Sequence, residues 1–367
     1  MKLTVDKAAL AAAAAIARHA TAKSGVTAHM LLAVDGNGRA TLSATNYDLA
    51  IDAALPGGEA GGAWLVPAEP LGRILAKLAD GPVTIGGGDG RVTLAQGRSR
   101  FELVALPGVE FPEPPALVGM AAPWLWPSSD LVAALAAAHC PSADDGRPAL
   151  TGVCLEVTGD DVTVAATDGH RLGVWQKPAA ELEAPAGAWI VHRSALAPLA
   201  AMAATVDALE VAAGGRHLRF AAGGVSLLVR PVEAVFPAWR CVLPAPSGDT
   251  LKLTIDRKGL VAAVAKVSTL SERVDLVALM ELEISALDST LTLRTKHSLY
   301  GHAETAIEIA GVYVDRKLLL DPRLVLEALG SFTGEHVTLA IRDAVTPVLV
   351  TCDAEPANRQ VLMPCKF

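Results

Sequence analysis

The residues best suited to chemistry are Asp168 and His170, which with Ser128 or Ser99 could suggest the acid, base and nucleophile of a hydrolase. In such a triad the carboxylate orients the histidine ring toward a serine hydroxyl. An Asp-x-His pair on one turn needs special geometry to aim the ring at a distant serine. The sequence also contains no Gly-x-Ser-x-Gly turn, which often presents such a nucleophile. We therefore expect no catalytic residue and no enzyme.

Two further patterns could bind a ligand. Residues 86–90 (Gly-Gly-Gly-Asp-Gly) look like a phosphate-binding loop but lack its Lys-Ser/Thr ending. They lie between two strand-like runs, which favours a hairpin turn. The five cysteines form no CxxC pair, and the nine histidines show no spacing of zinc ligands. We expect reduced thiols, no metal and no cofactor.

Composition limits the class of protein without fixing its function. With 367 residues, 51% of them apolar and 19% charged, the chain is a folded protein of two or three domains. No apolar run reaches membrane-spanning length, and Asp6 stands where the apolar part of a secretion signal would begin. The expected location is therefore the cytoplasm. The net charge of −8 argues against a general nucleic-acid binder, but basic residues gathered on one inner surface would be compatible with it.

The elements that would position any site recur three times along the chain. A short alternating strand, an Asp or Ser that can cap a helix, and an Ala/Val/Leu-rich helix begin at residues 3, 124 and 253. A second landmark, Ala-Thr-Asn-Tyr-Asp-Leu at 44–49, recurs at 166–172 and more weakly at 293–297. A third landmark, the strand at 63–66, recurs at 188–191 and loosely at 312–314. A helical segment is expected after each copy, at 71–78, 195–203 and 322–329, and strand-rich stretches follow. The order is strand, helix, strands, helix, strands.

This repeat predicts an α+β protein with three tandem domains, each a β-sheet layer with two helices packed on one side. Proline-rich stretches that include Pro112, Pro114, Pro115 and Pro123, and then Pro237, Pro244 and Pro246, mark the boundaries. We expect domains at residues 1–120, 121–247 and 248–367. A period of about 120 to 130 residues is long enough for an independent domain.

Four motifs in a fixed order make the prediction more specific. They are Ala-Thr-Asp-Gly-His-Arg-Leu at 166–172, Gly-Arg-Ser-Arg-Phe at 97–101, the stretch from Phe236 to Pro244, and Val-Leu-Met-Pro at 361–364. With three α+β repeats of this size, the whole chain resembles the bacterial DNA polymerase III beta subunit family, the sliding clamps. The resemblance implies a head-to-tail homodimer closed into a ring, with an outer β wall and inner helices.

A sliding clamp touches DNA phosphates without reading base sequence. The resemblance therefore implies double-stranded DNA as a partner and basic residues on or beside the inner helices. The candidate channel residues are Arg18, Lys23, Arg73, Lys77, Arg193, Lys258 and Lys266. The alternative interpretation is that these are ordinary solvated charges.

The resemblance also implies a pocket that takes a short peptide with hydrophobic anchors. Its partners would be the polymerase III catalytic subunit, the clamp loader and other proteins with a clamp-binding motif. The expected lining is Leu150, Thr167, Gly169, His170, Arg171, Leu172, Pro237, Val242, Pro347, Val361, Met363, Pro364 and Cys365. Cys241 stands where the family usually has a basic residue and Cys365 where it has Met, and Lys366 and Phe367 end the chain. These changes put the preferred peptide in doubt.

The ring interface implied by the resemblance joins a basic, aromatic edge to an apolar and acidic one. The expected residues are Arg98, Arg100, Phe101 and Leu103 on one alternating strand, and Leu270 and Glu304 on the other edge. His302 lies beside Glu304, and both arginines are expected on one face of their strand. The alternative is an edge strand protected by charge. A clamp-like scaffold or mobile-element decoy that does not load onto DNA is the alternative function.

Overall fold

The computed structural model describes the chain except residues 114–118, 180–183, 215, 246, 275–276, 311–313 and 366–367. Three of the boundary prolines (Pro114, Pro115 and Pro246) lie outside the described residues, as do Lys366 and Phe367. The third copy of an expected strand, at 312–314, lies almost entirely outside them.

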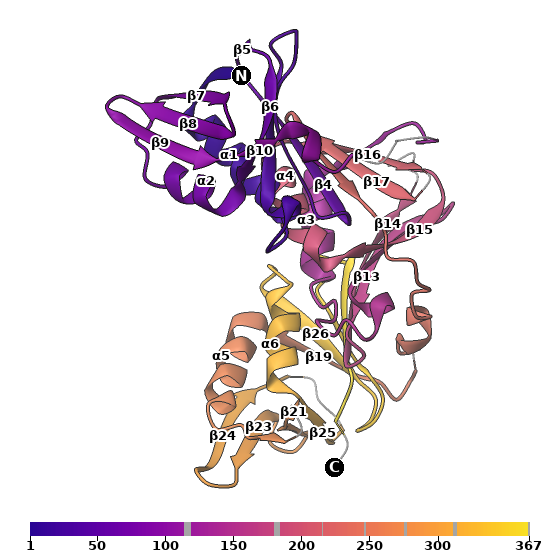
Figure 1. Ribbon diagram of the computed structural model, residues 1–367. Coiled ribbons are helices and arrows are strands. Elements are labelled where there is room, and N and C mark those ends of the chain that lie inside the picture. Colours follow the sequence, from indigo (N-terminus) through magenta and orange to yellow (C-terminus); the bar gives the residue numbers. More distant parts are fainter. Residues whose placement is uncertain are drawn as a thin grey trace. The chain divides into compact units, whose positions relative to one another are not determined.

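The described elements run three times through one order: strand, helix, four strands, helix, three strands (Figure 1). The first pass is β1(Lys2–Asp6), α1(Lys7–Ala17), β2(His29–Val34), β3(Ala40–Thr45), β4(Leu49–Leu55), β6(Gly62–Pro67), α2(Ala68–Leu75), β7(Pro82–Gly88), β8(Arg91–Gln96) and β9(Ser99–Val104). The second is β11(Trp124–Pro127), α3(Ser128–Ala137), β12(Gly152–Val157), β13(Asp161–Thr167), β14(Arg171–Pro178), β15(Gly187–His192), α4(Leu196–Ala203), β16(Ala208–Gly214), β17(His217–Ala222) and β18(Val225–Val229). The third is β19(Leu251–Asp256), α5(Arg257–Ser268), β22(Met280–Ser285), β23(Thr290–His297), β24(Gly301–Glu308), β25(Arg316–Leu320), α6(Pro322–Gly330), β26(His336–Ile341), β27(Val348–Thr351) and β28(Asn358–Leu362). Short strands β5(Gly58–Ala60), β10(Leu106–Pro107), β20(Arg273–Val274) and β21(Val277–Ala278) interrupt this order.

Side-chain caps explain where several helices begin. Asp6 accepts a hydrogen bond from the backbone N–H of Ala8 at 2.8 Å, and Asp256 accepts one from Gly259 at the same point of the third pass. Asp321 caps α6 by accepting from Arg323 N–H at 2.9 Å. Each carboxylate satisfies an N–H group that the helix itself leaves unpaired. The expected caps at Asp6 and Asp256 are confirmed.

The chain divides into two compact units. Unit 1 takes in the described residues of 1–131, 182–185 and 191–231, and unit 2 those of 132–181, 186–190 and 232–367. In unit 1 a nine-stranded sheet runs β10-β6-β2-β3-β4-β18-β17-β16-β11, and a five-stranded sheet runs β5-β1-β7-β8-β9. The nine-stranded sheet joins strands of the first and second passes where β4 pairs with β18.

Unit 2 repeats this plan with the second and third passes. Its eight-stranded sheet runs β15-β12-β13-β14-β28-β27-β26-β19, and β14 pairs with β28 where the two passes meet. A four-stranded sheet runs β24-β23-β22-β25. The predicted α+β class with repeated two-helix units is confirmed. Because neighbouring passes share a sheet, the compact units do not follow the expected domain boundaries, which stay a prediction.

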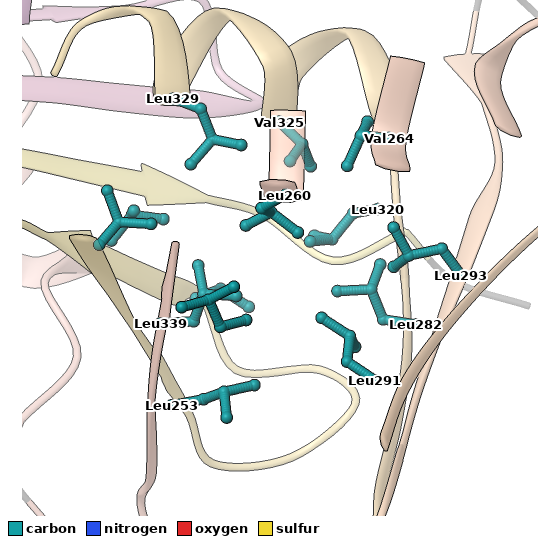
Figure 2. Close-up of a cluster of buried hydrophobic side chains, with 14 of the residues drawn as sticks. Leu253, Leu260, Val264, Leu282, Leu291, Leu293, Leu320, Val325, Leu329 and Leu339 are labelled. Atoms are coloured by element: carbon teal, nitrogen blue, oxygen red, sulfur yellow. The ribbon is translucent and has the colours of Figure 1, made fainter. Parts of the chain in front are cut away.

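The core of unit 2 lies between α5, α6 and the two sheets. Figure 2 shows leucines and valines from the helices, among them Leu260, Val264 and Leu329, pointing toward Leu282 and Leu339 from the strands. All five are at most 4% exposed. Burying each such side chain contributes roughly 1.5 to 3 kcal/mol. The helices therefore pack on one face of the third-pass strands of the eight-stranded sheet, and another segment can pack on the opposite face.

Two local predictions can be compared directly with the structure. The glycine-rich stretch at 86–90 is a hairpin turn, as expected: β7 ends at Gly88, and Asp89 and Gly90 have φ of 48° and 71°. Such positive φ values at both central positions are typical of a tight two-residue hairpin. The expectation that Arg98 lies in a strand is wrong, because β9 begins at Ser99 and Arg98 belongs to the preceding turn.

Candidate partner-binding surface

The turn between β13 and β14 is held by its own side chains. The Thr167 hydroxyl donates to the carbonyl of Arg171 at 2.6 Å and accepts from the N–H of Gly169 at 3.1 Å. Asp168 accepts from the N–H groups of His170 at 2.9 Å and Arg171 at 3.2 Å. Gly169 has φ of 95°, a conformation that favours glycine. The sequence Thr-Asp-Gly-His-Arg therefore builds a rigid turn.

Arg171 ties this turn to helix α6. Its Nε donates to the Asp168 carboxylate at 3.0 Å, and its Nη1 forms an ion pair with Glu327 of α6. The same Nη1 lies 3.4 Å from Nε2 of His139. Burial, and then the charge of Arg171, lower the pKa of His139, so the neutral ring accepts this hydrogen bond. With only 11% of its side chain exposed, Arg171 acts as a structural link beneath the expected pocket.

Three neighbouring strands place apolar side chains in one row. Leu172 of β14 stands opposite Val361 of β28, which stands opposite Leu349 of β27. Alternation along each strand puts this row on one face, while Val348 and Leu362 point into the core of unit 2. The row therefore lies on the sheet face that the α5–α6 core does not cover.

A segment after β18 covers this row. Trp239, in a short 3-10 helix at Trp239–Val242, is 5% exposed and packs with Leu172, Val361, Ala165 and Val174. Phe236, Leu243 and Leu349 pack against the same cluster while remaining partly exposed. Arg240 stacks over the Trp239 ring at 4.3 Å and pairs with Glu156 at 2.7 Å. The result is an apolar surface with half-buried edges, suited to receiving hydrophobic anchors.

The structure brings most of the expected pocket residues to this surface or its border. The N–H of Met363 donates to the carbonyl of His170 at 3.0 Å, which joins the end of β28 to the turn. Met363 is 36% exposed and Val242 41% exposed. Pro237 is exposed, Pro347, Pro364 and Cys365 are half-buried, and Leu150 is buried at the end of a 3-10 turn. All thirteen belong to unit 2.

Sequence reasoning missed four residues of this surface: Phe236, Trp239, Leu243 and Leu349. It selected Pro237 and Val242 instead, which are exposed neighbours in the same segment. A signal was present, because Trp239 is one of six tryptophans and stands in a segment without strand or helix periodicity. A large aromatic in such a segment usually has a packing partner.

The expected channel residues lie on or beside helices within their own units. Arg18 and Lys23 follow α1, and Arg73 and Lys77 lie on or after α2, which packs against α1. Arg73 pairs with Glu69 at 3.6 Å, with both side chains about 70% exposed. Lys258 and Lys266 are exposed on α5, and Arg193 lies in the 3-10 turn before α4. α5 holds three basic residues and no acidic one, and its Arg257 donates to the carbonyl of Gly334.

The expected interface residues lie on or next to two sheet edges. β9 is the last strand of its sheet in unit 1, with Arg100 exposed and Phe101 and Leu103 half-buried on the opposite face. β24 is the last strand of its sheet in unit 2, where His302 and Glu304 are exposed on one face. Leu270 follows α5 and is half-buried. Glu304 accepts from Arg294 Nε at 2.5 Å, so its charge is already paired within the chain.

Asp168 and His170 are not arranged as parts of a catalytic triad. The Asp168 carboxylate binds Arg171 and two backbone N–H groups of its own turn, and His170 is exposed. Across the described part of the chain, no helix has the length and apolar character needed to span a bilayer.

Comparison with solved structures defines the class of this fold. The chain is similar over its whole length to the Caulobacter crescentus beta sliding clamp with bound PEG. The TM-score is 0.91 at 25% identity, and the match covers 100% of this chain and 99% of that one. It matches a Pseudomonas aeruginosa sliding clamp bound to griselimycin equally well in fold, with a TM-score of 0.91, 24% identity and 100% of both chains covered. The fold is thus that of a clamp.

Sequence comparisons give the family. Residues 131–238 match the family model for the central domain of the DNA polymerase III beta subunit, and residues 241–366 match the model for its C-terminal domain. The beta sliding clamp of Caulobacter vibrioides (strain NA1000 / CB15N) is 26% identical over 379 residues, covering 100% of both chains. That of Escherichia coli K12 is 26% identical over 334 residues, covering 89% of both. The chain belongs to the DNA polymerase III beta subunit family, the sliding clamps.

Proposed function

We propose that this protein is a DNA sliding clamp that encircles duplex DNA as a homodimeric ring and tethers the replicative polymerase. The observation that carries the proposal is the match of all three passes of the fold to beta sliding clamps over the full chain. Three clamp domains, at 1–120, 121–247 and 248–367, would make each half of the ring. A scaffold or decoy that does not load onto DNA is the weaker alternative, because nothing in the relatives favours it.

Basic residues beside the helices, all exposed except the half-buried Arg193, support the DNA part of the proposal. Helix α5 presents Lys258 and Lys266 without a neighbouring acid on the same helix. Arg18, Lys23, Arg73, Lys77 and Arg193 would supply the matching positions in the other domains. Diffuse contacts of this kind attract phosphates and let a protein slide, because no base edge is read. The acidic total charge would then lie away from the DNA.

The apolar surface around Trp239 supports the tethering part. A peptide from the polymerase, the clamp loader or another partner would place apolar anchors against the half-buried side chains of Phe236, Leu243 and Leu349 and the exposed side chain of Met363. Methionine adapts to anchors of different shape. Arg171 and the Thr167 turn would hold the rim in position. The protein would act by binding rather than by catalysis, in the cytoplasm.

The two edge strands support the ring. β9 of one protomer would meet β24 of its partner in a head-to-tail contact. Such contacts produce a closed ring when the rotation between the two protomers brings the second pair of edges together. Phe101, Leu103 and Leu270 would supply apolar area, and Arg98 or Arg100 would face Glu304. Because Glu304 is bound to Arg294, the partner's arginine would join an existing ion pair rather than form a new one.

A processivity assay tests the tethering function. Primed single-stranded circles are extended by a matched polymerase III core and clamp loader with a trap that prevents rebinding. We expect long products with the wild-type protein and short ones with Met363→Asp, which places a charge at the exposed edge of the apolar surface. A matched Leu287→Asp variant, changing a side chain that is 93% exposed, should support long products. Long products from Met363→Asp would contradict the proposed pocket.

A further inference from the structure

Unit 1 contains a turn built like the one at the expected pocket in unit 2. The Thr45 hydroxyl donates to the carbonyl of Leu49 at 2.9 Å, just as Thr167 donates to Arg171. Asn46 accepts from the N–H groups of the residues two and three positions on, at 3.2 and 2.8 Å, just as Asp168 does. These hydrogen bonds of the two turns are equivalent, while the bond from Arg171 Nε to Asp168 has no counterpart at Leu49.

The strands beside these turns are also equivalent. In unit 1 the N–H of Arg230 donates to the carbonyl of Asp48 at 2.8 Å, and in unit 2 that of Met363 donates to His170 at 3.0 Å. Ala50 pairs with Leu228 across β4 and β18, as Leu172 pairs with Val361 across β14 and β28. Arg230 therefore occupies the position of Met363, and Leu228 that of Val361.

A pocket of 320 Å³ lies at this equivalent place. Its lining is Thr45, Tyr47, Asp48, Leu49, Ala50, Pro112, Glu113, Arg216, His217, Leu228 and Arg230. Pro112 follows Phe111 as Pro237 follows Phe236, and His217 precedes β17's Leu218 as Pro347 precedes Val348. Nine lining positions thus match nine of the expected peptide-pocket positions, although Pro114, which matches Trp239, lies outside the described residues.

The chemistry of the two places differs. Arg230 replaces Met363 and His217 replaces Pro347, and Arg216 stands beside them. Burial, and then the positive charge of Arg230, lower the pKa of His217. The ring is therefore neutral at pH 7, and it lies in the positive field of Arg230. The floor stays apolar, with Leu49 1% and Leu228 9% exposed.

Tyr47 adds a contact that the unit 2 pocket lacks. It takes the position of Gly169 with φ of 73°, a left-handed conformation that a side chain makes unfavourable. Its side chain is 67% exposed at the rim of the pocket. Exposed tyrosine and arginine around an apolar floor are the composition of protein-binding hot spots.

We propose that this pocket in unit 1 is a second docking site, for an acidic peptide segment of a partner protein. A carboxylate of the peptide would pair with Arg230 and Arg216, and an adjacent apolar side chain would rest on Leu228 and Ala50 beside Tyr47. A peptide is favoured over a nucleic acid because the turn and the strand pairing match those of the expected peptide pocket in unit 2. The inference rests on the proposed function only in treating the unit 2 surface as a peptide pocket.

Fluorescence polarisation tests the proposal with the full-length protein. The probe is a fluorescein-labelled nine-residue peptide with a central leucine, a glycine on each side of it and three glutamates at each end. We expect saturable binding that weakens roughly tenfold or more in Arg230→Glu and falls with added salt. Arg39→Glu, the same charge change on an exposed hairpin, should bind like the wild type, and so should Met363→Glu in the other pocket.

Four results would overturn the proposal. They are no saturable binding, equal binding of a matched peptide with lysines in place of glutamates, loss of binding in Met363→Glu but not in Arg230→Glu, and displacement by a single-stranded oligonucleotide that depends on Arg230. Retention of Arg230→Glu on circular DNA separates the two proposals. A variant that loses the acidic peptide and still stays on circles leaves the clamp function intact.

Discussion

Arg171 is the residue on which the expected pocket most depends. Its guanidinium binds Asp168 of the turn and Glu327 of α6, with 11% of the side chain exposed. Removing one partner from a buried ion pair leaves the other charges uncompensated. We expect Arg171→Met to lower the free energy of unfolding by about 3 kcal/mol, measured by urea denaturation. Arg342→Met, which removes an arginine 43% exposed, is the control and should cost well under half as much. Equal losses of unfolding free energy in the two variants would show that the bonds of Arg171 to Asp168 and Glu327 contribute little to stability.

Cys241 offers a chemical report on the same surface. It is exposed beside Trp239, whereas Cys140, Cys154 and Cys352 are at most 5% exposed. Burial raises the pKa of Cys140 and of Cys154 to about 12, so both stay protonated and unreactive near neutral pH. We expect one fast reaction with a disulfide reagent at about pH 8, lost in Cys241→Ser and slowed by a bound partner peptide. A fast reaction that persists in Cys241→Ser would mean that another thiol is accessible.

At the scale of elements, the end of β28 borders the expected pocket. The N–H of Met363 bonds to His170, and Cys365 N–H bonds to the carbonyl of Leu319. The described segment after Leu362 contributes no side chain to the buried core of unit 2. We expect a chain ending at Leu362 to lose partner-peptide binding at least tenfold while keeping its dimer, by titration calorimetry and light scattering. Loss of the dimer in that truncation would mean that the pocket is misplaced.

The edge strand β9 carries the prediction about assembly. Arg98 and Arg100 are exposed at the edge of its sheet. Reversing both charges would set them against the acidic edge of a second protomer, and like charges at an interface are strongly unfavourable. We expect Arg98→Glu with Arg100→Glu to give monomers in sedimentation, and Arg39→Glu with Arg73→Glu to stay dimeric. A dimer of unchanged affinity would place the interface elsewhere.

Features that depend on a few neighbouring residues could be predicted from the sequence, and contacts between distant segments could not. The caps at Asp6 and Asp256 and the turn at Asp89-Gly90 are set by a few neighbouring residues, and all three were predicted. Trp239 was missed because its partners Leu172 and Val361 come from strands far along the chain. Their register is set by the packing of the whole sheet, which no local pattern records.

For the whole molecule, the three-fold repeat in the sequence predicted the fold. The two compact units have other bounds than the repeats, because each unit is built around a sheet that two repeats share. β18 completes a sheet begun by β4, and β28 completes one begun by β14. Each boundary between neighbouring repeats is therefore a continuous β ladder. The same construction explains why an equivalent turn occurs in both units. It would also let successive repeats form one outer wall, which a closed ring requires.

The claim that this protein encircles DNA is tested most directly by its retention on circular and linear DNA. The protein is loaded onto nicked circles by a matched clamp loader and ATP, separated from free protein by gel filtration, and then treated with an enzyme that cuts the circle once. We predict that it stays on intact circles and leaves after the cut, because only a topological link is lost. Failure to remain on circles, or equal retention on cut DNA, would contradict encirclement.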